Sequence, residues 1–308
     1  MAVKMPRLRH FLLLLLCAGS LLSAQPETAG DFLESAREHF ERRRFLNTLD
    51  SLRVVLQMTV NDDAKKNRIK LEAEVLAAQS LEALGRQDEA ANMYERAVAH
   101  GYPDKRALAY LGRYFEAHAQ WEKAREYLSA YFAADKSDAE THIRYAVVLA
   151  RLKQRAQAKE LLSAIEPAGP GKKAEECELL EKQKKLRQAY DCFVAYRNSH
   201  PDREAGYLAL YRIGRFLGDR QKQAQSAQTL YWLFGDDTRY IWPLVEVRLA
   251  ERRFYDARLL LEEVIRLKGK DSDAERLLAN LQRDAPEAIK KPFRATPAEM
   301  RLLREMEP

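Results

Sequence analysis

Apolar residues recur at intervals of three and four through residues 105–138, in two runs that a short polar turn separates. This spacing places the apolar side chains on one face of an α-helix, whereas a half-buried strand would alternate them with polar ones. Small residues stand at matched positions of the two runs, Gly112 in the first and Ala124 in the second. Small side chains let two helix backbones approach closely, so the pattern predicts an antiparallel pair of helices.

The same pattern returns along the chain at a fixed interval. Ala90, Ala124 and Ala158 are 34 positions apart, and Ala189 and Ala257 are 68 apart, which is twice that interval. Each of these alanines begins a second helix, with apolar or aromatic residues four and seven positions later. A fixed period with two helices in each period predicts an array of helix pairs.

A helix–turn–helix repeated at this period resembles the tetratricopeptide repeat. In that family the first helix carries Leu-Gly and an aromatic residue, and the second carries a small alanine, an aromatic residue and another alanine before a proline. Leu111, Gly112, Phe115 and Ala124 match this pattern, and five such units stand in register along the chain, although several lack the glycine. The resemblance implies an all-α fold, an α-solenoid of antiparallel helix pairs in a right-handed superhelix with a C-terminal capping helix.

The predicted repeat array covers residues 25–283. Its helix pairs are expected at the following ranges, the last of which is the cap: 29–62, 71–104, 105–138, 139–171, 172–203, 205–236, 238–270 and 271–283. Gly169-Pro170-Gly171 cannot continue a helix, so 169–171 is a candidate hinge between two halves of the array. Residues 284–308 form a proline-containing tail, in which Thr296 and Pro297 suit the start of a short helix at 297–306.

Residues 1–24 have the three parts of a secretory signal peptide. Basic residues precede an apolar run of about a dozen residues, and small residues end the segment before Gln25. Because the run is shorter than the roughly 20 residues that span a bilayer, we expect cleavage and export to the periplasm or the medium. The alternative is a lipoprotein signal that ends at Cys17 and anchors the protein to a membrane. The large Leu16 before that cysteine favours plain secretion.

The composition is that of an ordinary soluble protein, with 32% charged and 46% hydrophobic residues. Good helix formers dominate it and glycine is scarce, which agrees with a helical fold. The formal net charge is +6, and loss of the three basic residues of 1–24 would reduce it to +3. A modest basic excess on an exported helical protein is usually a solvated surface, so we expect no nucleic-acid partner.

Cys177 and Cys192 remain after removal of the signal, and they lie in the two predicted helices of one repeat. A disulfide between them would pin that pair, because an exported protein can keep one. The alternative is two small buried residues, since Cys192 is one position off the face that should meet the first helix.

The sequence holds no constellation typical of catalysis. The six histidines are scattered, and the motifs of zinc proteases, serine hydrolases and phosphate-binding loops do not occur. The two cysteines lack the spacing of metal ligands. We therefore predict that the protein is not an enzyme and uses no metal or cofactor.

By the same resemblance, the first helix of each pair is expected to line a groove. The corresponding positions include the following six: Arg106, Arg113, Glu116, Ile143, Val147 and Arg151. Arg106 and Arg113 would meet an acidic peptide, and Ile143 with Val147 would take an apolar side chain or an amphipathic helix. The alternative is a groove face without a partner. Trp242 belongs to an aromatic cluster that either packs between two repeats or, where exposed, anchors a partner.

These features predict a non-enzymatic scaffold or adaptor in the bacterial cell envelope that binds a protein or peptide through the groove. One alternative is a structural subunit that associates with itself in an envelope or appendage assembly. Another is a binding protein associated with the cell wall. Membrane contact is expected only if Cys17 is lipidated. The partner's identity does not follow from a resemblance at the level of the fold.

Overall fold

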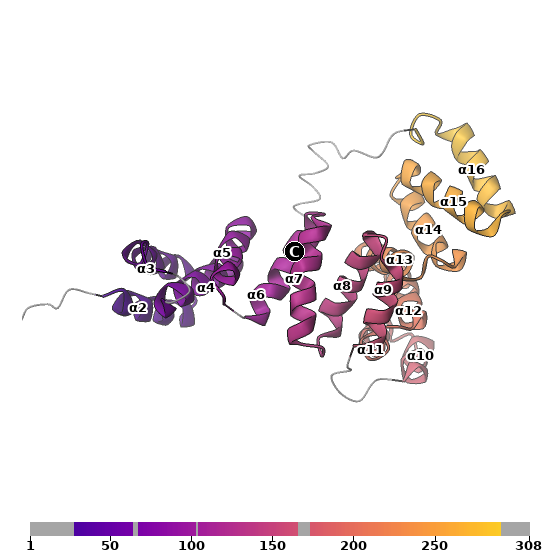
Figure 1. Cartoon of the computed structure of the whole chain (residues 1–308). Coiled ribbons are helices and arrows are strands. Elements are labelled where there is room, and N and C mark those ends of the chain that lie inside the picture. The colour runs from indigo at the N-terminus through magenta and orange to yellow at the C-terminus, as the bar shows by residue number, and fades with distance from the viewer. Residues whose placement is uncertain (1–27, 64–66, 103, 166–172, 291–308) are drawn as a thin grey trace, which may run out of the picture. The chain divides into compact units, whose positions relative to one another are not determined.

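The computed structural model describes residues 28–63, 67–102, 104–165 and 173–290 (Figure 1). These residues form fifteen α-helices and one short 3₁₀ helix, and no strand occurs among them. The predicted all-α fold of helix pairs is therefore confirmed. The expected signal peptide at 1–24, hinge at 169–171 and helix at 297–306 lie outside the described residues. No helix within the described ranges is both long enough and apolar enough to cross a bilayer.

The chain forms two compact units, residues 1–111 and 112–308, and the boundary falls within helix α6 (Lys105–Ala117). In the first unit two complete helix pairs precede α6: α2 (Ala29–Glu41) with α3 (Phe45–Met58), and α4 (Arg68–Ala83) with α5 (Gln87–Ala99). Leu33, Leu52 and Ala73 come from α2, α3 and α4, and they belong to one buried core.

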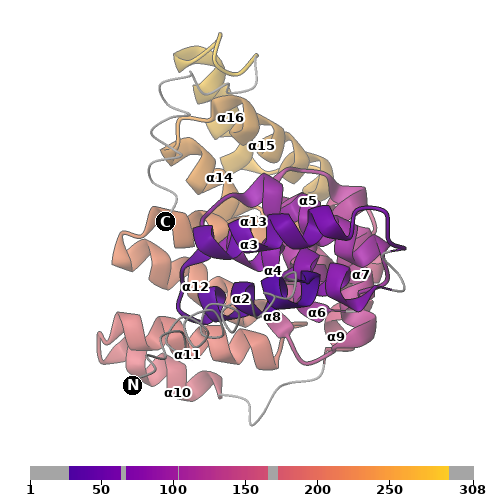
Figure 2. The ribbon, with the colours of Figure 1, turned by 90° about the vertical axis from the view of Figure 1, so that its left-hand side faces the viewer.

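In the second unit the end of α6 precedes α7 (Trp121–Ala134), and further pairs follow. They are α8 (Ala139–Arg151) with α9 (Arg155–Ser163), α10 (Ala174–Lys182) with α11 (Leu186–Ser199), α12 (Glu204–Leu217) with α13 (Arg220–Phe234), and, after the 3₁₀ helix η1 (Thr238–Tyr240), α14 (Trp242–Ala250) with α15 (Phe254–Lys268). The last described helix, α16 (Ser272–Asp284), packs on α15 and covers one of its faces (Figure 2).

One kind of backbone turn joins the two helices of every pair. A residue with φ between 56° and 72° follows each first helix, in the order Arg43, Gly85, Ala119, Lys153, Lys184, Gly218 and Arg252. The next N–H donates to the carbonyl five positions back, as Gln120 does to Phe115 at 2.9 Å. This is the Schellman pattern, which satisfies carbonyl groups that a helix end leaves unpaired.

The turns recur every 34 residues, the interval that also separates the alanines in the sequence. This spacing holds for the turn residues Gly85, Ala119 and Lys153, and again for Lys184, Gly218 and Arg252. At six of the seven turns, the residue five positions after the positive-φ residue has no exposed surface. In chain order these six residues are Thr48, Ala90, Ala124, Ala158, Ala189 and Ala257. Protein interiors are close packed, so a much larger side chain there would push the second helix away from its neighbours. The period of small residues therefore marks a buried contact within the pairs.

The pair α12–α13 places its small residue on the other helix. Gln223 stands five positions after its turn, and Gly214 on α12 faces it. A Cβ added to Gly214 would lie 3.1 Å from the backbone nitrogen of Gln223 and 3.3 Å from its Cα. The glycine thus gives the space that alanine gives elsewhere, and the turn at Gly218 keeps the regular spacing of the array.

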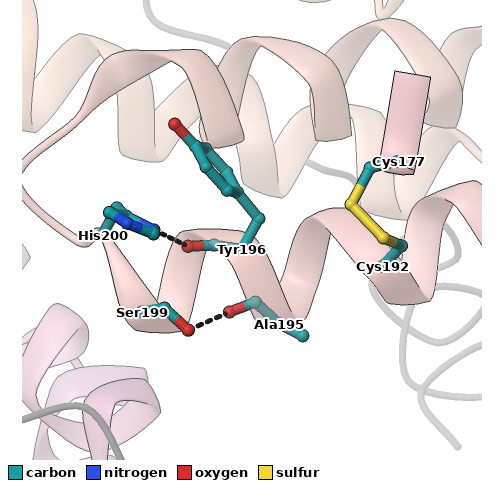
Figure 3. Close-up of a disulfide and its surroundings, with 6 residues drawn as sticks. All are labelled: Cys177, Cys192, Ala195, Tyr196, Ser199 and His200. Carbon is teal, nitrogen blue, oxygen red and sulfur yellow. Dashed lines mark hydrogen bonds between the residues drawn. A yellow bond between two sulfur atoms is a disulfide. The ribbon is translucent and has the colours of Figure 1, made fainter. Parts of the chain in front are cut away.

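Cys177 of α10 and Cys192 of α11 are joined by a disulfide, with their Cα atoms 5.4 Å apart (Figure 3). Both cysteines belong to a buried cluster that also contains Phe193 and Ile213. Helix α10 has nine residues, so it brings little apolar surface to the pair. The bonded residues are 15 positions apart, and a loop of this length gives about 3 kcal/mol of stabilisation by restricting the unfolded chain.

Gly112 of α6 faces Leu128 of α7, and a Cβ added to Gly112 would lie 2.5 Å from Leu128 Cδ2 and 2.6 Å from its Cγ. Leu128 has no exposed surface, so it has little room to move aside. We expect Gly112→Ala to lower the free energy of unfolding by about 1–3 kcal/mol in urea denaturation. Gly30→Ala is the control, because its Cβ would meet only Thr28 Oγ1 at 3.4 Å. Equal stability of the two variants would contradict this contact.

His142 of α8 is fully buried beside Tyr131 and Phe132, whose ring centroids lie 5.5 and 4.8 Å from its own. Burial lowers the pKa of His142 below its ordinary value of 6.5, and this effect outweighs the opposing influence of Asp135 and Asp138. The unfolded chain therefore takes up a proton at this residue at a higher pH than the folded chain does.

We expect the free energy of unfolding to fall as the pH drops from about 7 to about 5, because protonation of His142 favours the unfolded chain in that window. The loss reaches at most about 1.4 kcal/mol per pH unit between the two pKa values. Denaturation of the wild type and of His142→Leu at both pH values measures it, since the variant lacks the titrating ring. An identical loss in both proteins would show that other groups carry the pH dependence.

Candidate binding site

A polar cavity of about 160 Å³ lies in the second unit, against helix α8. Its walls come from α6, α8, α11, α12 and α13, so helices of four successive pairs contribute to it. Helix α13 packs directly against α8 and α9, although a whole helix pair separates them in the sequence (Figure 1). The cavity therefore exists because the array folds α13 back onto α8.

Charged residues of α9 hold the end of α13 in this place. Arg155 donates to the Trp232 carbonyl oxygen at 2.9 Å and forms an ion pair with Asp236. Lys159 Nζ lies 2.8 Å from the second carboxylate oxygen of Asp236. Partial burial raises the pKa of Asp236, but the bonds from Lys159 and Arg155 outweigh it and hold that pKa below its ordinary value. The ionised Asp236 thus fastens α13 to α9 at neutral pH.

Arg151, the last residue of α8, contacts two tryptophans from other helices. Its guanidinium carbon is 4.3 Å from the ring centroid of Trp121 on α7 and 4.7 Å from that of Trp232 on α13. Burial lowers the pKa of Arg151, Glu116 opposes this effect, and Arg248 adds to it. An arginine nevertheless stays protonated at neutral pH. Among the described residues its guanidinium has no hydrogen-bond acceptor and no ion-pair partner.

Both glutamates of the cavity are paired with arginines. Glu116 of α6 accepts a hydrogen bond from Arg144 Nη1 at 3.2 Å, and Glu140 of α8 pairs with Arg197 of α11. Burial raises the pKa of Glu116, while Arg144 and Arg151 act against this shift. Three arginines thus face two carboxylates, and Arg151 carries the surplus positive charge.

Neutral polar side chains complete the lining. Gln228 and Thr229 of α13 are half-buried in it, and Gln225 of the same helix is exposed. Amide and hydroxyl groups can donate hydrogen bonds to a polar ligand without adding charge. No group of histidines, cysteines and acidic residues in the described ranges is arranged to hold a metal ion. The lining is thus suited to binding a polar or anionic group.

Four of the predicted groove residues, Glu116, Ile143, Val147 and Arg151, line this one cavity. Ile143 and Val147 are only 4% and 9% exposed, so they are not the open apolar strip that the sequence suggested. The physical reason is that α11 and α13 pack against α8 and cover this part of its surface.

The other three candidates lie outside the cavity lining. Arg106, in the first unit, donates to Glu82 at 2.9 Å, and Glu82 also accepts a hydrogen bond from Tyr94. Arg113, in the second unit, is exposed, and Trp242 is half-buried at the start of α14. The pair of arginines expected to meet an acidic peptide is thus divided between the two units.

The sequence analysis linked neither Trp121 nor Trp232 to Arg151. Trp121 stands nearly one repeat before the arginine, at the first position of the preceding second helix, and this spacing is the signal that was available. Trp232 had no such signal, because it reaches Arg151 only through the folding of two further helix pairs. Arg144 and Arg197 were missed because each pairs with a glutamate of another helix, Arg144 with Glu116 and Arg197 with Glu140.

No protein-family model matches the sequence, and no curated protein matches it. Several solved structures are similar. A tetratricopeptide repeat protein from Parabacteroides merdae has 11% identity and a TM-score of 0.41, over 83% of this chain and 99% of its own. YrrB, titled a TPR protein with an unusual peptide-binding site, has 14% identity and a TM-score of 0.39, over 73% of this chain and 95% of its own. PilF of Pseudomonas aeruginosa has 16% identity and a TM-score of 0.37, over 71% of this chain and 97% of its own.

These likenesses are at the level of the fold. The chain's own helix pairs, the turn that closes each of them and the regular spacing of those turns give it the repeat architecture of the tetratricopeptide type.

Proposed function

We propose that this chain is a non-enzymatic scaffold that binds a protein or peptide partner in the bacterial cell envelope. The cavity against α8 carries the proposal, because Arg151 holds a positive charge there without an ion-pair partner among the described residues. A buried or half-buried charge is costly unless something neutralises it, so a ligand that supplies the partner gains free energy on binding. Exposed Gln225 on α13 gives such a ligand access to the lining.

The remaining charges of the cavity support binding rather than catalysis. Glu116 and Glu140 are each held by an arginine, so neither is free to act as a general base. Repeat arrays of this kind present side chains from many helices on one extended surface, which suits recognition of a macromolecule. Interaction without chemistry is therefore the function that the cavity supports best.

Export is the second part of the proposal. Residues 1–24 have the composition of a signal peptide. The disulfide between Cys177 and Cys192 supports the same location, because disulfides persist in oxidising compartments such as the periplasm and are rare in the cytosol. Lipidation at Cys17 is the alternative, and it would keep the protein at a membrane.

Self-association is a second candidate function, and exposed apolar side chains favour it. Leu46 and Met58 of α3 and the nearby Val60 are 62%, 50% and 64% exposed. Large exposed apolar groups occur at protein interfaces, so a second copy of this chain could cover them. A structural subunit of an envelope assembly would use such a contact.

A photo-crosslinking amino acid placed at Gln225 tests the partner in living cells. We expect irradiation to join a different protein to the Gln225 position, because this residue lines the cavity. The same amino acid at Glu275, exposed on α16 away from the cavity lining, is the matched control. Products that contain only this chain would favour the self-associating subunit and contradict the scaffold. The intact mass of the recovered protein shows whether it begins at Gln25 or at a lipid-modified Cys17, and an intact residue 1 would contradict export.

A further inference from the structure

We infer that the cavity binds a carboxylate group of the partner. This carboxylate accepts hydrogen bonds from the free N–H groups of Arg151, the residue that contacts both Trp121 and Trp232. The inference rests on the proposed function and names the chemistry of the ligand at that same cavity. It is carried by the arrangement of Arg151 and its neighbours, which leaves one side of the guanidinium for an anion.

The two indole rings determine how Arg151 can be approached. Its guanidinium carbon lies over both rings, at 4.3 Å and 4.7 Å from their centroids. Ring faces attract a cation but accept none of its in-plane hydrogen bonds well. All five N–H groups of a guanidinium lie in its plane, so the contacts with the ring faces use none of them as hydrogen-bond donors. A carboxylate is flat and accepts two parallel hydrogen bonds from the edge of a guanidinium.

The neighbouring charges are already neutralised within the chain. Glu116, the acidic residue that acts on Arg151, is bonded to Arg144. Arg248, which repels Arg151, forms an ion pair with Glu251 at 2.6 Å. Neither neighbour is therefore free to saturate Arg151, and the guanidinium keeps its hydrogen-bonding capacity for a ligand.

Size and charge favour a carboxylate over a larger anion. A cavity needs about 10–15 Å³ to hold one water, so the space of about 160 Å³ has room for a short acidic side chain or a chain terminus. Arg151 carries the one surplus positive charge of the lining, which matches the single charge of a carboxylate, whereas a phosphate brings a second negative charge. Gln228 supplies a neutral amide donor for an oxygen that Arg151 does not reach, whereas the Thr229 hydroxyl already donates to the Gln225 carbonyl oxygen at 2.9 Å.

The three tryptophans of the sequence provide the readout. None of them lines the cavity, but Trp121 and Trp232 contact Arg151, whereas Trp242 belongs to α14, which contributes no residue to the lining. In a ¹H–¹⁵N spectrum of the full mature chain, the indole N–H signals of Trp121 and Trp232 therefore report on the site. The signal of Trp242 serves as an internal reference. The probe is a five-residue alanine peptide with glutamate at its centre, acetylated and amidated at its ends. The same peptide with glutamine is the matched control.

We expect the glutamate peptide to shift the Trp121 and Trp232 signals with saturation and to leave Trp242 in place. The glutamine peptide should shift none of them. A penta-alanine peptide with a free C-terminus forms the second arm, which tells a chain-terminal carboxylate from a side chain. Absence of a shift with both carboxylate peptides up to millimolar concentration, or equal shifts with the glutamine peptide, would overturn the inference.

Variants assign the effect to Arg151. Arg151→Lys keeps the charge but lacks the two-donor edge, so binding of the effective peptide should weaken by about tenfold or more, in line with the roughly 1.5–3 kcal/mol of a hydrogen bond to a charged group. Arg239→Gln is the control, since Arg239 also lies over an aromatic ring, 5.5 Å from that of Tyr240, but outside the cavity lining. Unchanged binding by Arg151→Lys and by Arg151→Met, with well-dispersed spectra, would also refute the assignment.

The two proposals fail in different ways. If the Gln225 position captures a foreign protein while neither carboxylate peptide binds, the scaffold function stands and the ligand chemistry named here is wrong. If a carboxylate peptide binds through Arg151 while Gln225 captures only this chain, the site is a carboxylate site that serves self-association, and the scaffold function is wrong.

Discussion

The turn that closes each helix pair is the constraint on which the rest of this structure depends. A residue with positive φ reverses the chain after every first helix, and the same pair of backbone hydrogen bonds closes all seven turns. At five of them the residue is an arginine, a lysine or an alanine, for which this conformation costs roughly 1–2 kcal/mol. The buried contacts that follow, such as that of Ala124 with its surroundings, must offset this cost. The pairs are thus held by packing rather than by local preference.

The candidate site is a consequence of that repetition. Successive pairs bring α13 onto α8, and the ion pairs of Arg155 and Lys159 with Asp236 fasten it there. This contact covers Ile143 and Val147, and it sets Trp232 against Arg151. A surface that would be an open apolar strip in an extended array becomes a small polar cavity with one surplus positive charge.

The fold could be predicted from the sequence because small residues such as Ala90 and Ala158 mark a contact that recurs with the repeat. The turns could not, since Arg43 and Lys153 carry no local sign of a positive φ. Repeat register also placed Glu116 and Arg151 in the site, because groove positions follow from the order of residues within a first helix. Repeat register could not show that α13 covers the groove, because α13 and α8 are separated in the sequence by a whole helix pair.

The packing of Trp232 on Arg151 joins α13 to α8 beside the cavity, and a double-mutant cycle measures it most directly. The free energies of unfolding of the wild type, Arg151→Met, Trp232→Leu and the double variant give the coupling between the two residues. A cation held against an indole predicts a coupling of about 0.5–2 kcal/mol. Simple additivity of the two single losses, within about 0.3–0.5 kcal/mol, would show that Trp232 does not pack on Arg151 and would contradict the described contact of α13 with α8.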